Sequence, residues 1–163
     1  MIEYIHRGDF MKNTTLCYIE KNGSYLMLHR VKKVNDENKD KWIGIGGKFE
    51  AGETPFDCVR RECLEETGAI PSNLKYRGVI TFVSNLFGTE YMHLFYAKDD
   101  GFTPSGECSE GELCWIEKSR IGELNLWEGD MIFLSAMEKE TPFFSLKLVY
   151  EGDKLVSHEI EYV

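Results

Sequence analysis

The chain has 163 residues, the size of one ordinary domain, and 42% of them are apolar, which is enough for a hydrophobic core. Acidic residues number 28 and basic residues 19, so the formal charge is −9. This balance argues against a partner that is a nucleic-acid polymer, because such proteins usually present a basic face. A nucleotide substrate is compatible, since a bound metal ion can invert the local field.

No apolar run approaches the roughly 20 residues of a membrane span, so we expect no membrane partner. The five cysteines are odd in number and form no CxxC pair, which argues against a disulfide framework or a structural zinc site. We therefore expect a cytoplasmic protein in which the cysteines are small core residues.

The first part of the chain predicts a β-hairpin followed by an exposed loop. Residues 14–20 and 24–30 are β-type runs joined by a Lys-Asn-Gly turn, and residues 32–41 are a charged stretch. Met11 leads almost directly into the first run. It is a candidate for the true start, which would make residues 1–10 an N-terminal extension and residues 11–163 a single domain.

A helix is predicted after the glycine-rich segment 42–49. Thr54 is a suitable N-cap, Pro55 fits the first helical position, and Gly68 fits the position that ends a helix. The apolar positions Phe56 and Val59 would anchor this helix to a sheet.

The second part of the chain adds strands and one helix. The pattern predicts strands over 74–84, 89–98 and 112–117, a helix over 131–139, and a last hairpin formed by 142–150 and 155–162. Because strands and helices are mixed along the chain, we expect an α/β sandwich with a mixed β-sheet.

Three carboxylates in the predicted helix carry the strongest chemical signal. Glu62, Glu65 and Glu66 stand at i, i+3 and i+4, so they share one arc of the helix surface. Like charges this close repel each other, and a hard divalent cation such as Mg²⁺ would relieve the repulsion while binding substrate phosphates. The alternative is a solvated acidic helix face.

The segment around these carboxylates resembles the box of the Nudix hydrolase family, GX5EX7REUXEEXGU. The fixed positions are matched by seven residues: Gly47, Glu53, Arg61, Glu62, Glu65, Glu66 and Gly68. Cys63 and Ala69 occupy the two aliphatic positions and depart from the usual Ile, Leu or Val. The resemblance implies an α/β/α sandwich, and it extends beyond the box to MutT/MutX-type 8-oxo-dGTP diphosphatases.

The resemblance also implies roles for the acidic residues. Glu62, Glu65 and Glu66 would ligate Mg²⁺, or Mn²⁺ as a substitute, together with the carbonyl of Gly46 and a loop acid. Glu110 is the candidate loop acid, and the alternative is that it is only a solvated side chain. Glu53 would fix the box loop with Arg61. The general base is one of Glu62, Glu66 and Glu110.

A substrate pocket needs aromatic walls and a few polar groups. The candidate lining residues, each of which could instead be structural, are Thr15, His29, Lys48, Phe82, Trp127 and Asp130. Trp127 would stack on the base and Lys48 would contact phosphate. Asp130 would accept hydrogen bonds from guanine N1–H and N2–H₂, and the alternative is that it caps the second helix. Ile43 stands where some relatives hold a base-reading asparagine.

The expected activity is cleavage of oxidised purine nucleoside triphosphates, such as 8-oxo-dGTP, to the monophosphate and pyrophosphate, which would remove them from the nucleotide pool. A second hypothesis is a Nudix hydrolase of another substrate: an ordinary dNTP, a dinucleoside polyphosphate or a nucleotide sugar. A third is a non-catalytic nucleotide sensor, which the complete set of box carboxylates disfavours. The oligomeric state and the preferred metal cannot be predicted from the sequence.

Overall fold

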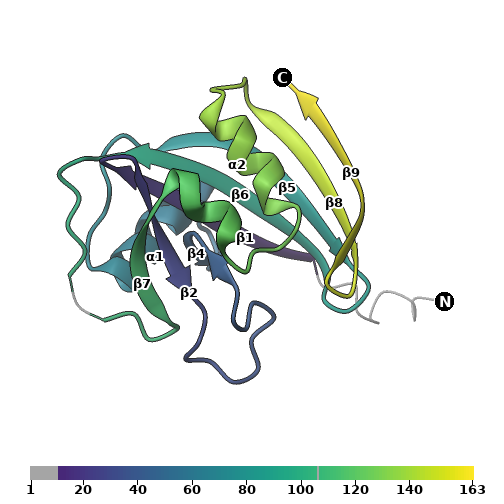
Figure 1. Ribbon diagram of the computed structural model, residues 1–163, viewed down its shortest axis with the longest axis horizontal. Coiled ribbons are helices and arrows are strands. Elements are labelled where there is room, and N and C mark those ends of the chain that lie inside the picture. The colour runs from purple at the N-terminus through teal and green to yellow at the C-terminus, as the bar shows by residue number, and fades with distance from the viewer. Residues whose placement is uncertain (1–10, 106) are drawn as a thin grey trace.

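The computed structural model describes residues 11–105 and 107–163 (Figure 1). The proposed N-terminal extension, residues 1–10, therefore lies outside the described residues, and its status stays a prediction. Neither of the two α-helices in the described part of the chain is long and apolar enough to cross a membrane.

One mixed β-sheet organises the described residues. Its strand order is β3-β2-β1-β6-β5-β8-β9, with β4 paired to β1 and β7 paired to β2. The β1–β6 and β5–β8 pairs are parallel and the remaining pairs are antiparallel. The strands are β1 (Met11–Lys21), β2 (Ser24–His29), β3 (Trp42–Ile43), β4 (Ile45–Lys48), β5 (Lys75–Ser84), β6 (Gly88–Lys98), β7 (Glu112–Glu117), β8 (Phe144–Glu151) and β9 (Lys154–Tyr162).

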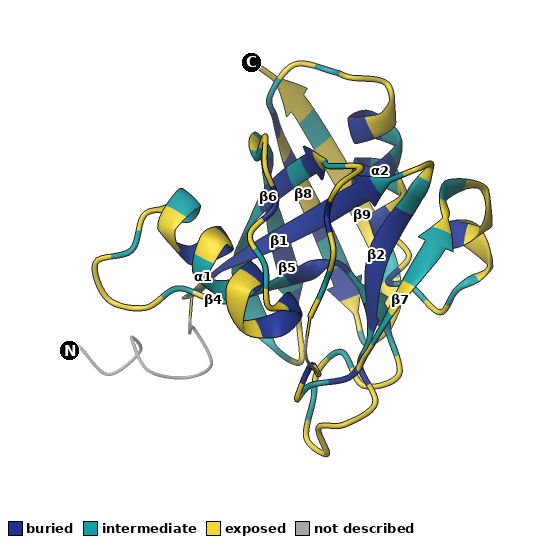
Figure 2. Ribbon diagram, turned by 90° about the vertical axis from the view of Figure 1, so that its left-hand side faces the viewer, coloured by how far each residue is buried: buried dark blue, intermediate teal, exposed yellow. Residues whose placement is uncertain are grey.

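Helices cover the two faces of the central strands of the sheet, which confirms the expected α/β/α sandwich. Strand β1 shows this by alternation: Tyr18 packs in the cluster that contains Phe133 of α2 (Asp130–Glu138), whereas Cys17 packs with Val59 of α1 (Pro55–Thr67). Successive side chains of a strand point to opposite faces. Figure 2 shows the result as a dark-blue β1 in the centre and a largely exposed β9 at the sheet edge.

Local signals place the ends of α1 as the sequence predicts. The Thr54 hydroxyl accepts a hydrogen bond from the Asp57 amide at 3.1 Å, and the Asp57 carboxylate accepts one from the Thr54 amide at 3.0 Å. This reciprocal capping box fixes the first turn. Gly68 ends the helix with φ +77°, a conformation that suits glycine because it has no Cβ.

The predicted elements are confirmed, with two additions and one correction. The glycine-rich segment forms β3 and β4, and a 3₁₀-helix, η2 (Lys118–Glu123), follows β7. Cys17, Cys58, Cys63 and Cys108 are buried, as expected for small core residues, but Cys114 is exposed. The prediction was wrong for Cys114 because β7 is an edge strand whose side chains alternate between two faces, and Cys114 lies on the exposed face.

Candidate active site

A cleft of about 570 Å³ opens between the N-terminal half of β1, the loop before β3, β4, and one face of α1. Its two ends differ in chemistry. At one end lie Glu62, Glu65 and Glu110, and at the other lie Phe82, Trp127 and Asp130. Acidic and aromatic residues that are far apart in the sequence therefore face one cavity.

Arg61 organises the acidic end of the cleft. Its guanidinium donates to both oxygens of Glu53, Nε to Oε2 at 2.7 Å and Nη2 to Oε1 at 2.8 Å, and Nη2 also donates to the carbonyl of Lys48 at 2.9 Å. Its Nη1 reaches Glu62 at 2.8 Å and Glu65 at 3.3 Å. A planar guanidinium is suited to such bidentate contacts.

Glu53 acts on the shape of the box loop, and it does not line the cleft. Its Oε1 accepts the Glu50 amide at 2.6 Å in addition to the contacts with Arg61. The hydrogen bond from the Arg61 side chain, and then that from the Glu50 amide, lower the pKa of Glu53 to about 2. Glu53 is thus an ionised side chain that links the box loop to α1.

Glu66 lies beneath the cleft, with 6% of its surface exposed. Its Oε2 accepts the Gly46 amide at 3.1 Å, whereas its buried Oε1 has no hydrogen-bond partner in the described part of the chain. Burial, and then the charges of Glu62 and Glu110, raise the pKa of Glu66 to about 9. A buried carboxylate oxygen without a partner is costly unless another group satisfies it.

Glu110 is brought to the carboxylate cluster by the fold. Arg30 is 7% exposed and holds Glu110 through Nη1 and Oε2 at 2.5 Å, while its Nε donates to Asp36 at 2.6 Å. Burial raises the pKa of Glu62, and the charges of Glu65 and Glu110 act in the same direction. The sequence placed Glu110 near this cluster only by resemblance, and it did not identify Arg30.

The donor set fits a hard divalent cation in kind. All donors are oxygens, and Glu66 Oε1 is a buried acceptor without a partner. The conformation is not that of a closed coordination shell. Among residues 11–105 and 107–163, no group of three or more His, Cys, Asp or Glu side chains is placed to hold a metal ion. The ion pairs with Arg61 and Arg30 explain this, because they turn Glu62, Glu65 and Glu110 toward guanidinium groups.

The other end of the cleft has the composition of a base pocket. Trp127 and Phe82 meet edge to face with centroids 5.3 Å apart, and Lys41 Nζ lies 4.9 Å from the Trp127 centroid. Thr15 also lines the cleft, where its hydroxyl lies 3.4 Å from Cys58 Sγ. Trp127 belongs to the core cluster as well, so packing fixes its position.

Asp130 is the first residue of α2 and is 5% exposed. Gly129 occupies the N-cap position and no side-chain hydrogen bond caps the helix, so the capping alternative for Asp130 is wrong. Burial raises the pKa of Asp130 to about 8, against the lowering effects of Lys41 and the Trp127 backbone. A buried acid with a perturbed pKa in a cleft is typical of a functional position.

Two other predicted lining residues differ in placement. Lys48 lines the cleft next to the acidic end. His29 does not line it: its ring stacks on Trp42 with centroids 4.4 Å apart, and its Nε2 lies 2.8 Å from Asp40 Oδ1. His29 therefore supports the loop before β3 through Asp40 and Trp42.

Sequence reasoning missed Asn38, which lies in the loop that it interpreted only as exposed. The Asn38 side-chain oxygen accepts the Trp127 Nε1–H at 2.8 Å, and Asn38 lines the cleft, as does Ile43. An asparagine in a charged loop gives no local signal of this role. Only the fold brings residues 38 and 127 together.

Comparison with known proteins agrees with this geometry. The NUDIX domain family matches residues 11–135. The chain is 30% identical over 135 residues to the uncharacterized Nudix hydrolase YvcI of Bacillus subtilis, covering 80% of this chain and 81% of that protein. It is 31% identical over 125 residues to the oxidized purine nucleoside triphosphate hydrolase of Danio rerio, covering 76% and 79%.

The fold also matches a solved structure, the MutT protein from Bacillus halodurans. The TM-score is 0.79 at 23% identity, with 92% of this chain and 97% of that chain covered. At this identity the likeness concerns the fold. The family match and the two relatives carry the assignment: this chain belongs to the Nudix family and is a hydrolase that acts on pyrophosphate bonds.

Proposed function

We propose that the protein is a Mg²⁺-dependent hydrolase of oxidised purine nucleoside triphosphates such as 8-oxo-dGTP, and that it releases the nucleoside monophosphate and pyrophosphate in the cytoplasm. The observation that carries the proposal is the composition of one cleft. It joins an oxygen-rich acidic end to an end walled by Phe82 and Trp127, as a triphosphate attached to a purine requires. The relatives from Danio rerio and Mus musculus, both oxidized purine nucleoside triphosphate hydrolases, support it.

Residues of the box would act on the phosphates. Glu62, Glu65, Glu66 and Glu110, with the carbonyl of Gly46, would hold the cation. A bound divalent ion lowers the pKa of a coordinated water and neutralises charge on the phosphates. The general base is one of Glu62 and Glu110, because both line the cleft, whereas Glu66 lies beneath it. Lys48 would contact the phosphate chain.

Asp130 would read the guanine edge. An ionised carboxylate only accepts hydrogen bonds, and guanine offers N1–H and N2–H₂ as donors, which adenine lacks at the same positions. Since the pKa of Asp130 is about 8 in the free protein, binding of this edge at neutral pH is accompanied by release of the carboxyl proton.

Asn38 would read the oxidised edge. Oxidation at C8 gives the purine an N7–H donor and an O8 acceptor, and a side-chain amide can accept from one and donate to the other. The amide oxygen already accepts from Trp127, but a carbonyl has two lone pairs. Ile43, in the same cleft, has no group that could make these contacts.

A substrate panel tests the proposal against other Nudix substrates. We expect kcat/KM to be highest for 8-oxo-dGTP among 8-oxo-dGTP, dGTP, dATP and ADP-ribose, with release of pyrophosphate only when Mg²⁺ is present. Preference for ADP-ribose would contradict the proposed substrate and leave the hydrolase assignment intact. Absence of cleavage with every substrate would favour a nucleotide-sensing role.

The two glycines of β4 make separable predictions. A Cβ on Gly47 would lie 2.5 Å from the Glu62 carboxylate, the movable end of a side chain, whereas a Cβ on Gly46 would lie 1.8 Å from the Thr15 carbonyl oxygen. We expect Gly47→Ala to fold and lose on the order of 10²-fold in kcat by displacing Glu62. Gly46→Ala should instead lower the melting temperature because it disrupts the β1–β4 pairing. Equal melting temperatures for the two variants would contradict this separation.

Glu66→Gln tests the acidic end of the cleft. The substitution keeps the size and buried packing of the side chain but removes a charged ligand, so we expect kcat to fall at least ~10²-fold in saturating Mg²⁺. The melting temperature should be unchanged or higher, since a carboxyl group beside Glu62 and Glu110 is replaced by a neutral amide. Turnover near that of the wild type would reject the metal-binding role of the cluster.

Asp130→Asn tests the guanine reader. We expect kcat/KM for guanine nucleotides to fall roughly 10- to 150-fold, the effect of a lost charged hydrogen bond of about 1.5–3 kcal/mol. In the wild type, the guanine-to-adenine ratio of kcat/KM should rise with pH and level off above about 8, because only the ionised carboxylate reads both donors. The ratio cancels the titration of groups that act on both substrates, and it should be independent of pH in the variant.

Protein stability provides the control for Asp130. The pKa of Asp130 is raised in the folded protein, so between about pH 4 and pH 8 the folded state holds a proton that the unfolded state has already released. The free energy of unfolding of the wild type therefore falls as the pH rises through this range. Asp130→Asn lacks this loss, so its advantage in melting temperature over the wild type should increase across that range. Lys41, Tyr18 and Tyr150 are the ionisable neighbours coupled to Asp130.

Asn38→Asp tests the reader of the oxidised edge. The new side chain keeps an acceptor for Trp127 but lacks the NH₂ that would donate to O8. We expect the 8-oxo-dGTP to dGTP ratio of kcat/KM to fall by about 3- to 10-fold, the value of one hydrogen bond. The added negative charge should weaken the binding of 8-oxo-dGTP and dGTP to a similar degree. A change in the ratio of their kcat/KM values therefore reports the lost hydrogen bond to O8. An unchanged ratio would show that another group reads O8.

A further inference from the structure

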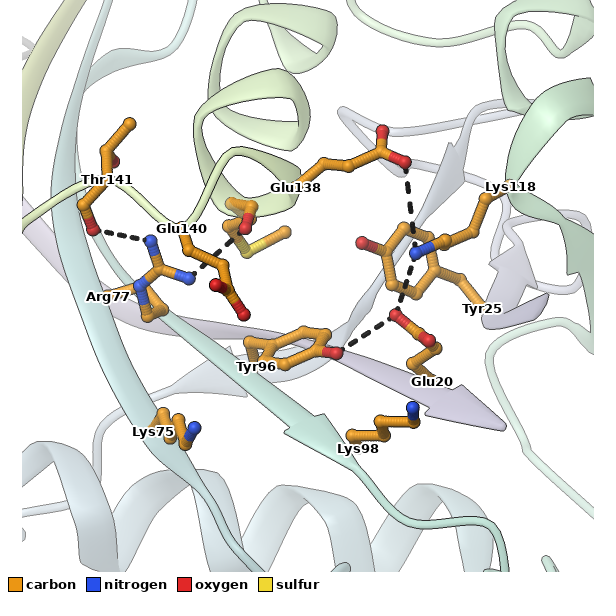
Figure 3. A pocket seen from close by; sticks show the side chains of 11 residues that line it. Glu20, Tyr25, Lys75, Arg77, Tyr96, Lys98, Lys118, Glu138, Glu140 and Thr141 are labelled. Carbon is orange, nitrogen blue, oxygen red and sulfur yellow. Dashed lines mark hydrogen bonds and ion pairs between the residues drawn. The ribbon is translucent and has the colours of Figure 1, made fainter. Parts of the chain in front are cut away.

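A second cavity, of about 510 Å³, lies between the C-terminal end of α2 and the ends of β1, β2, β5 and β6 (Figure 3). It shares no lining residue with the active-site cleft. Its volume falls within the range of small-molecule sites, about 300–1,000 Å³. None of the residues that line it belongs to the Nudix box, residues 47–69.

A buried carboxylate forms one wall of this cavity. Glu20 has a side chain that is 9% exposed, and its Oε1 accepts hydrogen bonds from Tyr96 Oη at 2.9 Å and Lys118 Nζ at 3.0 Å. Its Oε2 accepts no hydrogen bond from the residues that the structure describes. Glu20 is therefore held rigidly and keeps one acceptor for another partner.

Tyr25 adds a hydroxyl donor to the cavity. The residue is 4% exposed, and Figure 3 shows its hydroxyl pointing into the cavity. Within residues 11–105 and 107–163 this hydroxyl has no hydrogen-bond partner, whereas the hydroxyl of Tyr96 donates to Glu20. The hydroxyl oxygen is not among the buried polar atoms without a partner, so it is open to the cavity and can donate to a ligand there.

Positive charges without counter-ions stand at the mouth. Lys75 and Lys98 line the cavity, and neither makes an ion pair with a carboxylate in the described part of the chain. Arg77 is the extra residue of a β-bulge in β5, and its Nη2 donates to the Thr141 carbonyl at 2.8 Å. Bulges re-aim side chains, and here the bulge adds a third cation that forms no ion pair with a carboxylate in the described part of the chain; the fourth, Lys118, pairs with Glu20.

The mixture of acidic and basic side chains in this cavity restricts the class of ligand that it can bind. Inorganic phosphate would suit the lysines and Tyr25 but would also face Glu20, Glu138 and Glu140, whereas a polyamine would suit these acids but face the lysines. A nucleoside monophosphate satisfies both. Its phosphate matches the ammonium groups, its ribose hydroxyls and base N–H groups match the carboxylates, and its base matches the ring of Tyr96.

We propose that this cavity is a second, non-catalytic nucleotide site that binds a nucleoside monophosphate. The phosphate lies at Lys75 and Lys98, and the nucleoside contacts Tyr25, Tyr96 and the free oxygen of Glu20. The assignment rests on the chemistry of the cavity and does not depend on the substrate proposed for the active-site cleft.

Titration of the full-length protein with GMP, followed by backbone NMR without divalent ions, tests the site. We expect saturable shifts at the amides of Lys75, Tyr96 and Lys98. In Lys75→Glu/Lys98→Glu the affinity at these amides should fall at least tenfold, the loss of a charged contact. The matched control, Lys147→Glu/Lys154→Glu, changes two exposed lysines outside both cavities and should leave the affinity within twofold of the wild type.

Two further measurements separate the alternatives. Tyr25→Phe removes only the unpartnered hydroxyl, so it should fold like the wild type and weaken GMP at these amides by about 3- to 10-fold. Guanosine and inorganic phosphate should each bind at least tenfold more weakly than GMP. Shifts confined to the active-site cleft, equal affinity for phosphate and GMP, or insensitivity to both sets of substitutions would overturn the proposal. None of these outcomes bears on hydrolysis in the cleft.

Discussion

The cleft depends on the guanidinium group of Arg61. This group joins three parts of the chain, because it holds Glu53 in the loop before α1, the carbonyl of Lys48 in β4, and Glu62 on its own helix. A lysine could not make these contacts together, since it has no planar set of donors. The contact sets the distance between β4 and α1, and this distance determines how close the backbone of Gly47 comes to the Glu62 carboxylate.

Arg30 has a comparable function on the other side of the carboxylate cluster. It is nearly buried and joins Asp36 of the loop to Glu110, so the loop that carries Asn38 and the acid that faces Glu66 are held by one side chain. Removal of one partner of such a buried pair leaves an uncompensated charge, which is costly. The loop over the base pocket and the acidic end of the cleft are thus physically connected.

The sequence predicts the parts of this protein that have local signals. The capping residues Thr54 and Gly68 mark α1, and the spacing of the glutamates places them on one face. The sequence cannot predict contacts that depend on long-range pairing. The partnership of Asn38 with Trp127, and that of Arg30 with Glu110, connect residues at least 80 positions apart. Asp130 shows a further limit: its type and position in the sequence suit a helix cap, but Gly129 takes the N-cap position and no side chain caps the helix.

The cleft carries an excess of acidic residues, as does the whole chain. Eight acidic and five basic residues line it, and Glu66 lies directly beneath. A triphosphate would therefore be repelled by the acidic end if charge alone decided binding, because like charges in a partly buried site are weakly screened. The proposed base pocket would hold the nucleoside through apolar and aromatic contacts, but the phosphates would require positive charge at the carboxylates. In the function proposed above, divalent cations would supply that charge, so substrate affinity and metal affinity should be coupled.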